Sequence, residues 1–266
     1  MNIQSLIIWA IILFVVIGAI ASYFTSGTDK RLNDAYIAYT QGEQASNVAS
    51  RELAFNKALS IYKQLSQEYP PPYGSGALDY NIGNSYFELG QYAPAVLHYY
   101  KAVKYDPWNS SAWSNLQVAL DKLHLSTKVP KHGWESIFSP SIGMSISLRY
   151  QLFFTASFVV LLLGSFYIWR TLPILKPYIW IAAGIAVLML LSLFVTQFIE
   201  PVGAVVVKST SLYRDAGNQY AKVLDTPLQE GLKIEVIEGA AGGNWVEVRT
   251  PEGALGYVPT NRIELL

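Results

Sequence analysis

The residue types that most often carry catalysis or bind metals are sparse in this chain of 266 residues. Its histidines show neither a His-Glu-x-x-His pattern nor a pair at helical metal-ligand spacing: His98, His124 and His132. The chain contains no cysteine, which excludes thiolate nucleophiles, zinc–thiolate sites and disulfides. It also lacks a Gly-x-Ser-x-Gly elbow, a phosphate-binding Gly-x-x-x-x-Gly-Lys-Ser/Thr loop and a dinucleotide fingerprint. The sequence therefore predicts a non-enzymatic protein without a metal or a cofactor.

Side chains suited to binding a peptide are instead grouped between residues 80 and 115. Four of them recur at the spacing of one helix face: Tyr80, Asn84, Phe87 and Glu88. A fifth, Asn115, belongs to a following helix. Aromatic rings pack against apolar groups, and carboxamides both donate and accept hydrogen bonds. Together these residues predict a protein-binding surface.

The elements that must position these side chains match a tetratricopeptide (TPR) repeat, a hairpin of two antiparallel helices. Small residues stand where the helices must approach closely, at Gly83 and Ala95, and Gly90 stands in the turn. Tyr99 would fill the space between the helices, and Pro107 would end the second one. Stacked hairpins of this kind present a concave surface to another protein. We expect the peptide-binding side chains to line that surface.

The chemistry of this surface has more than one interpretation. Asn84 and Asn115 match two asparagines of the TPR carboxylate clamp, which holds the C-terminal carboxylate of a peptide, but Tyr80 replaces its lysine. In a second interpretation, Tyr80 and Phe87 are simply buried against the neighbouring hairpin. We favour an aromatic, weakly polar groove for a segment of a partner protein.

The remaining polar part of the N-terminal half extends this helical array. A degenerate earlier hairpin is predicted because three residues repeat the spacing of the second TPR helix: Ala58, Tyr62 and Pro70. Extra residues around 42–50 are expected to separate its two helices. The first-helix pattern returns from Ala112 onward, which predicts a single capping helix.

Long apolar segments lie on both sides of the array. The chain is 52% hydrophobic and only 14% charged, whereas soluble domains carry about 25% charged residues. Residues 6–24 could span a bilayer; Ala19-Ile20-Ala21 also fits a signal-peptide cleavage site, and we favour an uncleaved anchor. Residues 152–169 and 178–199 predict a transmembrane hairpin. Neither run contains Asp, Glu, Lys, Arg or His, which argues against a transport pathway.

The loop of this hairpin carries Arg170 and Lys176, which favours a cytoplasmic position for the loop. The domains on either side of the hairpin would then share the opposite side of the membrane. The expected location is a bacterial inner membrane with both domains extracytoplasmic.

The C-terminal segment has the pattern of a small all-β domain. Short β-rich runs are separated by glycine-containing turns: 205–207, 233–237, 245–248 and 256–258. The runs around Trp245 and Gly256-Tyr257-Val258 resemble a bacterial SH3 domain, and Pro259-Thr260-Asn261 resembles the Pro-x-Asn turn of SH3 domains.

The SH3 resemblance implies a groove for an extended peptide. Its nearest equivalents of the groove residues are Tyr213, Trp245, Tyr257 and Pro259. Arg262 stands in the place of a groove tyrosine. The alternative is that Trp245 and Tyr257 only fill the core of a small barrel.

The order of the segments resembles the BatE proteins of the Bacteroides aerotolerance operons along essentially the whole chain. That resemblance implies a scaffold in an envelope complex, beside membrane proteins with von Willebrand A domains and a MoxR-type ATPase. The predicted fold is a multi-domain membrane protein with all-α TPR hairpins, a transmembrane helical hairpin and a small all-β SH3-like barrel. Its predicted domains are a 1–25 anchor or signal peptide, a 29–125 TPR-like domain, a 126–150 linker, a 151–200 transmembrane hairpin and a 202–266 SH3-like domain.

The sequence thus predicts a membrane-anchored adaptor that docks partner proteins through both domains. The alternative is binding or sensing of peptidoglycan through the SH3-like domain. The formal net charge is zero, which argues against a nucleic-acid partner.

Overall fold

The computed structural model describes residues 29–69, 76–125, 144, 146–198, 202–239 and 243–266. The predicted anchor at 1–25 and most of the predicted linker lie outside these residues. The chain divides into two compact units between Ile61 and Tyr62, inside helix α3.

The first unit is a helical hairpin formed by α2 (Lys30–Gln44) and the first part of α3 (Val48–Glu68). The Asp29 carboxylate caps α2 by accepting a hydrogen bond of 2.9 Å from the Arg31 backbone N–H. The helices meet where Gly42 faces the buried Phe55 ring, and a Cβ on Gly42 would lie 2.8 Å from that ring. The extra residues predicted around 42–50 do not form a long loop. Only residues 45–47 separate the helices.

Helices α4 (Ala77–Glu88), α5 (Tyr92–Tyr105) and α6 (Ser110–Lys122) form an array in the second unit. Gly90 has φ 72° in the turn between α4 and α5, a conformation that favours glycine. Gly83 lies against the fully buried Tyr99 ring, since a Cβ there would be 2.7 Å from it. The Asn109 side chain caps α6 through a 2.9 Å bond from Ala112 N. The close approach, turn and capping helix predicted for this segment are confirmed.

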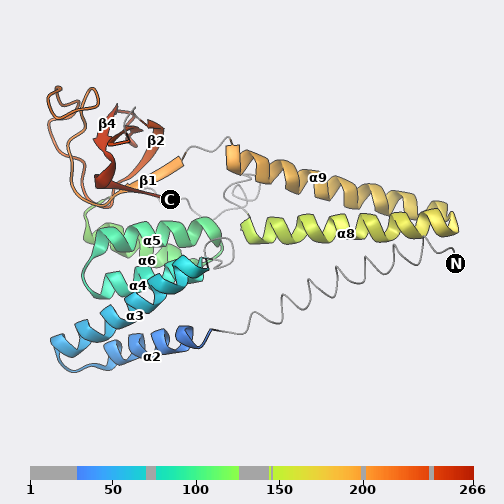
Figure 1. Cartoon of the computed structure of the whole chain (residues 1–266), viewed down its shortest axis with the longest axis horizontal. Coiled ribbons are helices and arrows are strands. Elements are labelled where there is room, and N and C mark those ends of the chain that lie inside the picture. The colour runs from blue at the N-terminus through green and yellow to red at the C-terminus, as the bar shows by residue number, and fades with distance from the viewer. Residues whose placement is uncertain (1–28, 70–75, 126–143, 145, 199–201, 240–242) are drawn as a thin grey trace. The chain divides into compact units, whose positions relative to one another are not determined.

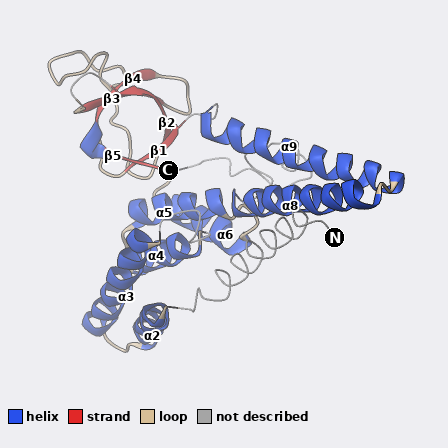
Figure 2. Cartoon of the chain, turned by 45° about the vertical axis from the view of Figure 1, so that its right-hand side comes forward, coloured by secondary structure: helices blue, strands red, loops and turns tan. Residues whose placement is uncertain are grey.

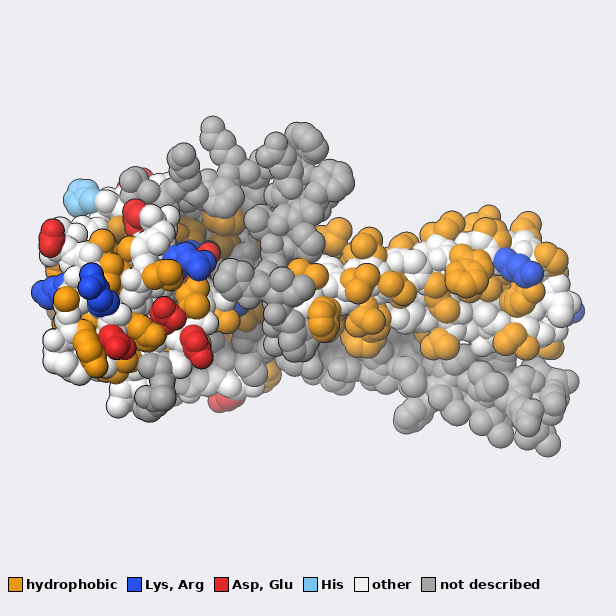
Figure 3. Space-filling view, turned by 90° about the horizontal axis from the view of Figure 1, so that it is seen from above, with side chains coloured by type: hydrophobic (Ala, Val, Ile, Leu, Met, Phe, Trp, Pro, Cys, Tyr) orange, Lys and Arg blue, Asp and Glu red, His pale blue; other side chains and the backbone are white. Residues whose placement is uncertain are grey.

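Two further helices, α8 (Ile146–Arg170) and α9 (Lys176–Phe198), run side by side as an antiparallel pair joined by the short η1 (Pro173–Leu175) (Figures 1 and 2). Both are long and apolar enough to cross a membrane by length and composition, with mean hydropathies of 2.0 and 2.4 in the segments Leu148–Arg170 and Pro173–Val195. Hydrophobic side chains are spread over the face of this pair seen in Figure 3. Phe154, Leu161 and Trp180 are among the large apolar side chains that it exposes.

The C-terminal part is one antiparallel sheet with the strand order β4-β3-β2-β1-β5. Its strands are β1 (Val202–Val206), β2 (Lys233–Gly239), β3 (Trp245–Arg249), β4 (Leu255–Pro259) and β5 (Ile263–Leu265). The 3-10 helix η2 (Thr260–Arg262) joins β4 to β5. The four β-rich runs predicted from the sequence are therefore confirmed as strand segments.

The sheet curves around an aliphatic core that includes Val206, Ile234, Val248 and Val258. The long connection between β1 and β2 folds back over this core and contributes Leu212 and Leu228 to it. Trp245 and Tyr257 are partly exposed and are not members of this core. The suggestion that these two aromatics only fill a barrel core is therefore wrong.

Helix α5 packs against the sheet as well as against its helical neighbours. Val205 of β1 belongs to the same buried cluster as the α5 side chains. The Lys101 ammonium lies 2.9 Å from a Glu264 carboxylate oxygen, and Lys104 Nζ donates to the Leu266 carbonyl at 2.7 Å. Lys233 Nζ lies 4.9 Å from the centroid of the Tyr100 ring. Val205 thus extends the helical core to the sheet, while the sheet keeps an aliphatic core of its own.

Candidate functional site

The first candidate surface is an amide cluster on the face of α4 and α6. Asn84 Oδ1 accepts two hydrogen bonds, one from the Tyr99 hydroxyl at 2.8 Å and one from Asn115 Nδ2 at 2.9 Å. Asn115 Nδ2 also lies 3.4 Å from the Tyr80 hydroxyl. Three of the five residues predicted for this surface are therefore brought together.

The amide cluster leaves hydrogen-bonding capacity unused. Asn84 Nδ2 and Asn115 Oδ1 have no hydrogen-bond partner among the described residues, and both side chains are partly exposed. A donor and an acceptor so close together match the N–H and C=O groups of an extended peptide backbone. The cluster can therefore form hydrogen bonds with the backbone of a bound peptide, whatever the charge of that peptide's side chains.

The aromatic residues beside the cluster have a double role. Tyr80 and Phe87 are partly buried and pack against the core shared by α5 and α6. The Phe87 ring meets Tyr92 edge-on, with centroids 5.3 Å apart. Glu88 is partly exposed in the last turn of α4. Both aromatics therefore pack inside the array, as one sequence interpretation had it, while part of each stays accessible.

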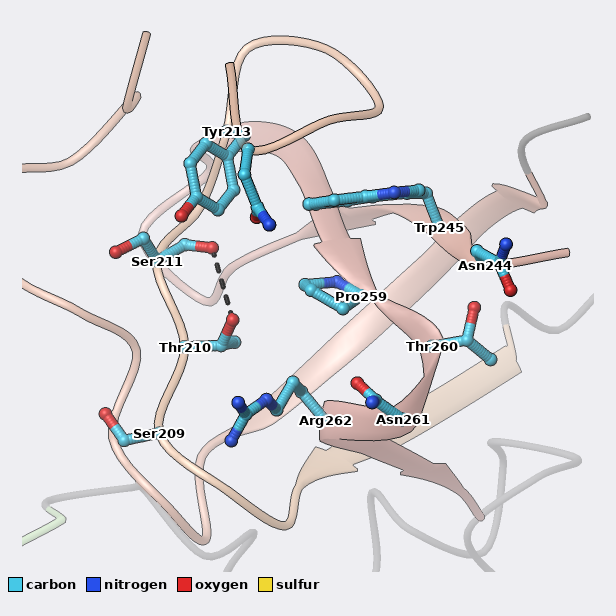
Figure 4. A pocket seen from close by; sticks show the side chains of 11 residues that line it. Ser209, Thr210, Ser211, Tyr213, Asn244, Trp245, Pro259, Thr260, Asn261 and Arg262 are labelled. Atoms are coloured by element: carbon cyan, nitrogen blue, oxygen red, sulfur yellow. Dashed lines mark hydrogen bonds between the residues drawn. The ribbon is translucent and has the colours of Figure 1, made fainter. Parts of the chain in front are cut away.

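The second candidate surface is a polar cavity of about 780 Å³ on the sheet (Figure 4). It is lined by hydroxyl, carboxamide, aromatic and proline side chains and one arginine: Ser209, Thr210, Ser211, Tyr213, Asn218, Asn244, Trp245, Pro259, Thr260, Asn261 and Arg262. We call it the sheet groove. The Tyr213 and Trp245 rings meet edge-on at 5.6 Å, and Trp245 stands opposite Pro259 in the β3–β4 register.

One of the four residues predicted for the sheet groove does not line it. Tyr257 pairs through its backbone with Tyr213, with N–H···O distances of 2.7 and 2.9 Å, but its side chain is not part of the lining. Its ring stands beside acidic groups. The Glu247 charge raises the pKa of Tyr257 most, and desolvation and the charges of Asp215 and Glu238 raise it further.

The charge of the sheet groove differs from that of the acidic neighbourhood of Tyr257. Arg262 is the charged residue in the lining, and its guanidinium points across the cavity toward the segment with Ser209 and Thr210 (Figure 4). The Arg262 carbonyl accepts hydrogen bonds from the backbone N–H groups of Val207 and Lys208. No partner of its guanidinium is found in the described part of the chain. The groove is therefore positive at the Arg262 end.

Comparison with known proteins agrees with the geometry of α4 and α5. The family of the tetratricopeptide repeat matches residues 80–109. This segment is a TPR repeat. No curated protein matches the chain, and neither does any solved structure. TPR repeats mediate contacts between proteins and are typically non-catalytic, so a role in protein–protein interaction is indicated for the chain.

The TPR repeat also places His98. Its ring Nδ1 lies 2.8 Å from an Asp79 carboxylate oxygen, and the ring stacks on Tyr86 with centroids 5.6 Å apart. These residues line a smaller cavity of about 360 Å³ together with Lys63 and Tyr105. Burial raises the pKa of Tyr105, and the Asp79 charge raises it further. His98 is therefore held inside the repeat by Asp79 and Tyr86.

Sequence reasoning missed several residues of both surfaces. It assigned Tyr99 to the space between the TPR helices, which is correct, but no sequence signal places its hydroxyl on Asn84. It also missed Ser209, Ser211 and Asn218, which come from the long β1–β2 connection. The resemblance at Pro259-Thr260-Asn261 and the position of Arg262 were signals for the opposite wall.

Proposed function

We propose that this chain is a non-enzymatic, membrane-anchored adaptor that docks partner proteins of a bacterial envelope complex. The observation that carries the proposal is the amide cluster of Asn84 and Asn115 on the accessible face of the TPR repeat. One amide donor and one amide acceptor there lack partners among the described residues, beside the partly exposed Tyr80. Buried or half-buried carboxamides gain stability from being satisfied, so a bound backbone segment completes the cluster.

The position of the sheet supports the TPR face as the docking face. In a TPR array the first helices of the hairpins line the concave side, and the second helices line the convex side. The sheet contacts α5, which is a second helix, through Lys101, Lys104 and Val205. The contact with the sheet therefore leaves the face formed by α4 and α6 to a partner.

The topology of the sheet supports an SH3-like barrel as the second docking module. The order β4-β3-β2-β1-β5, the long β1–β2 connection and the 3-10 turn before β5 are the features expected of that barrel. SH3 domains bind extended proline-rich peptides in a groove lined by aromatic side chains. The sheet groove likewise carries two aromatic side chains, Tyr213 and Trp245, beside Pro259.

Membrane anchoring is supported by α8 and α9. Both present large apolar side chains over their length. At the hairpin end, the Arg170 guanidinium lies 4.6 Å from the Trp169 ring and Lys176 Nζ lies 5.6 Å from the Tyr167 ring. Aromatic and cationic side chains are both favoured at the membrane–water interface. We place this end at the cytoplasmic surface and the TPR and SH3-like domains on the extracytoplasmic side.

The proposed partners are membrane proteins of the same complex, of the von Willebrand A domain type that the family resemblance implies. The test is photocrosslinking in native membranes. A photoreactive residue replaces Val118, which is exposed and lies three residues after Asn115 on the same side of α6. The matched control position is Ser110, which is exposed in the first turn of α6 and lies about 140° around the helix from Asn115.

A discrete crosslinked membrane protein at Val118, absent at Ser110 and weakened by Asn115→Ala, is the expected result. We choose Asn115 rather than Asn84 because Asn84→Ala would also remove a hydrogen bond of the buried Tyr99 hydroxyl. Equal crosslinking at both positions would contradict a TPR docking face.

A second candidate function is binding of peptidoglycan through the sheet groove, which its polar lining favours. Wall peptides offer hydrogen-bonding groups that suit hydroxyl and carboxamide side chains. Co-sedimentation of the detergent-solubilised chain with purified sacculi tests this candidate. Retention that is lost in Trp245→Ala would support it, and absence of retention would reject it.

A further inference from the structure

We propose that the segment bound in the sheet groove carries a carboxylate, and that Arg262 is the residue that selects it. The proposal rests on the sheet groove being a docking site, as proposed above, and it adds the chemistry of the ligand. The occupant is an extended, acidic segment of a partner protein.

The Arg262 guanidinium lines the groove without a partner of opposite charge among the described residues. The side chain is only partly exposed, and it has no hydrogen bond among the described residues either. The other described arginines in the sheet domain differ in position. Arg249, for example, lies outside the groove and pairs with Glu235 at 3.3 Å. A half-buried guanidinium without a partner is costly, and a ligand carboxylate would remove that cost.

The donors of the groove have a geometry that suits a carboxylate. The planar guanidinium can bind both oxygens of one carboxylate through parallel N–H···O bonds. It faces a wall that carries the side chains of Ser209, Thr210 and Ser211 (Figure 4). The hydroxyls of Ser209 and Thr210 donate to the carbonyls of Leu228 and Ser211. The Ser211 hydroxyl, which has no hydrogen bond among the described residues, can donate to a further oxygen of an acidic ligand. Asn261, beside Arg262, adds a carboxamide. Among the residues that the structure describes, no aspartate or glutamate lines the groove to compete for these donors.

The charge along the groove changes in a way that sets the direction of the bound segment. Trp245 stands opposite Pro259, and two residues further along β3 Glu247 stands opposite Tyr257 and next to Glu238. Two residues of a strand span about 7 Å. An acidic group is thus attracted at the Arg262 end and repelled beyond Trp245, so the charge of the ligand fixes which way it lies.

The commitment to a protein segment follows from the shape and setting of the groove. The Tyr213, Trp245 and Pro259 side chains form an aromatic and apolar wall, which suits the side chains of an extended peptide next to its acidic residue. The same chain carries a TPR repeat, whose proposed ligand is also a protein segment.

The experiment measures fluorescence anisotropy of dye-labelled peptides with the full chain in detergent micelles. The probe is a proline-rich decapeptide with two glutamates, and its partner peptide has glutamines in their place. We expect the glutamate peptide to bind about tenfold more tightly, as one charge-assisted bidentate contact provides. Arg262→Gln should remove this difference without weakening the glutamine peptide. Arg262→Lys should retain part of it.

Arg249→Gln is the matched control, since it removes an arginine of the same sheet that does not line the groove. Equal binding of both peptides to the unchanged chain, lost in Trp245→Ala, would overturn the carboxylate preference and leave the groove as a docking site. Binding of neither peptide would overturn this proposal together with that docking site. Displacement by soluble muropeptides, with no binding of either peptide, would assign the groove to the cell wall instead.

Discussion

At the scale of single residues, two glycines decide how closely helices pack. Gly83 lies under the Tyr99 ring and Gly42 under the Phe55 ring, and a Cβ at either position would come within 3 Å of the ring. Neither ring has free space, since both are fully buried, and the Tyr99 hydroxyl is also held by Asn84. Interhelical distance is thus set by the absence of one carbon atom.

We expect Gly83→Ala to destabilise the TPR repeat by about 1–3 kcal/mol, as overpacking of a full core does. Helix propensity alone predicts the opposite sign, a gain of about 1 kcal/mol. Thermal unfolding followed by circular dichroism separates the two effects. Gly239→Ala is the control, because a Cβ there meets nothing within 4 Å. An unchanged or raised melting temperature in Gly83→Ala would refute the packing argument.

At the scale of elements, α5 packs against neighbours on two of its faces. One face packs on α4 and α6, and the other meets β1 and β5 through the Lys101–Glu264 pair and the Lys104 bond to the Leu266 carbonyl. The pKa of Lys233 is lowered there, first by desolvation and then by the charge of Lys104, while Glu235 acts in the opposite sense. The contact of sheet and helices is therefore built from lysine stems as much as from aliphatic side chains.

The contact predicts a zero-length crosslink. A carbodiimide should join Lys101 to Glu264, because their charged atoms are 2.9 Å apart. Mass spectrometry of the digested full chain should reveal the joined peptides. Lys101→Arg keeps the ion pair but removes the reactive amine, so the product should vanish in that variant. Failure to detect the product in the unchanged chain would contradict direct packing of the sheet on α5.

Some elements of the fold could be predicted from the sequence, and others could not. Gly83, Gly90 and Tyr99 predicted α4 and α5 because small and large residues alternate at TPR spacing. The extra residues predicted around 42–50 shrink to 45–47, because the Asn47 side chain caps the start of α3 by accepting a hydrogen bond from Ser50 N at 2.8 Å. Part of the sheet groove escaped prediction because residues 207–232 take their path from tertiary contacts, which no local periodicity encodes.

At the scale of the whole molecule, the contact between α5 and the sheet constrains membrane topology. The TPR helices and the sheet pack on each other, so they lie on the same side of a membrane. The chain between them must therefore cross the membrane an even number of times. Helices α8 and α9 supply two such crossings in our proposal. Two crossings put both domains on one side of the membrane whatever the charges of Arg170 and Lys176, and those charges favour the same arrangement.

Topology can be mapped with single cysteines, since the chain contains none. His124→Cys and Glu252→Cys introduce thiols at exposed positions before and after the hairpin, and Thr171→Cys introduces one between α8 and α9. We expect a membrane-impermeant maleimide to label the first two from the same side and the third from the other side. Labelling of the first two from opposite sides would contradict the packing of the sheet on α5.

The close contact of Gly42 with Phe55 bears on how such a chain can lengthen. Helix α3 has 21 residues, whereas α5 has 14, and Phe55 stands seven residues before the Tyr62 that matches Tyr99. Seven residues are close to two helical turns, so an insertion of that size returns the same side of the helix to its neighbour. Related hairpins should therefore differ in helix length by about seven residues at a time. In each of them, α2 should carry a glycine at the position that faces the aromatic ring of α3.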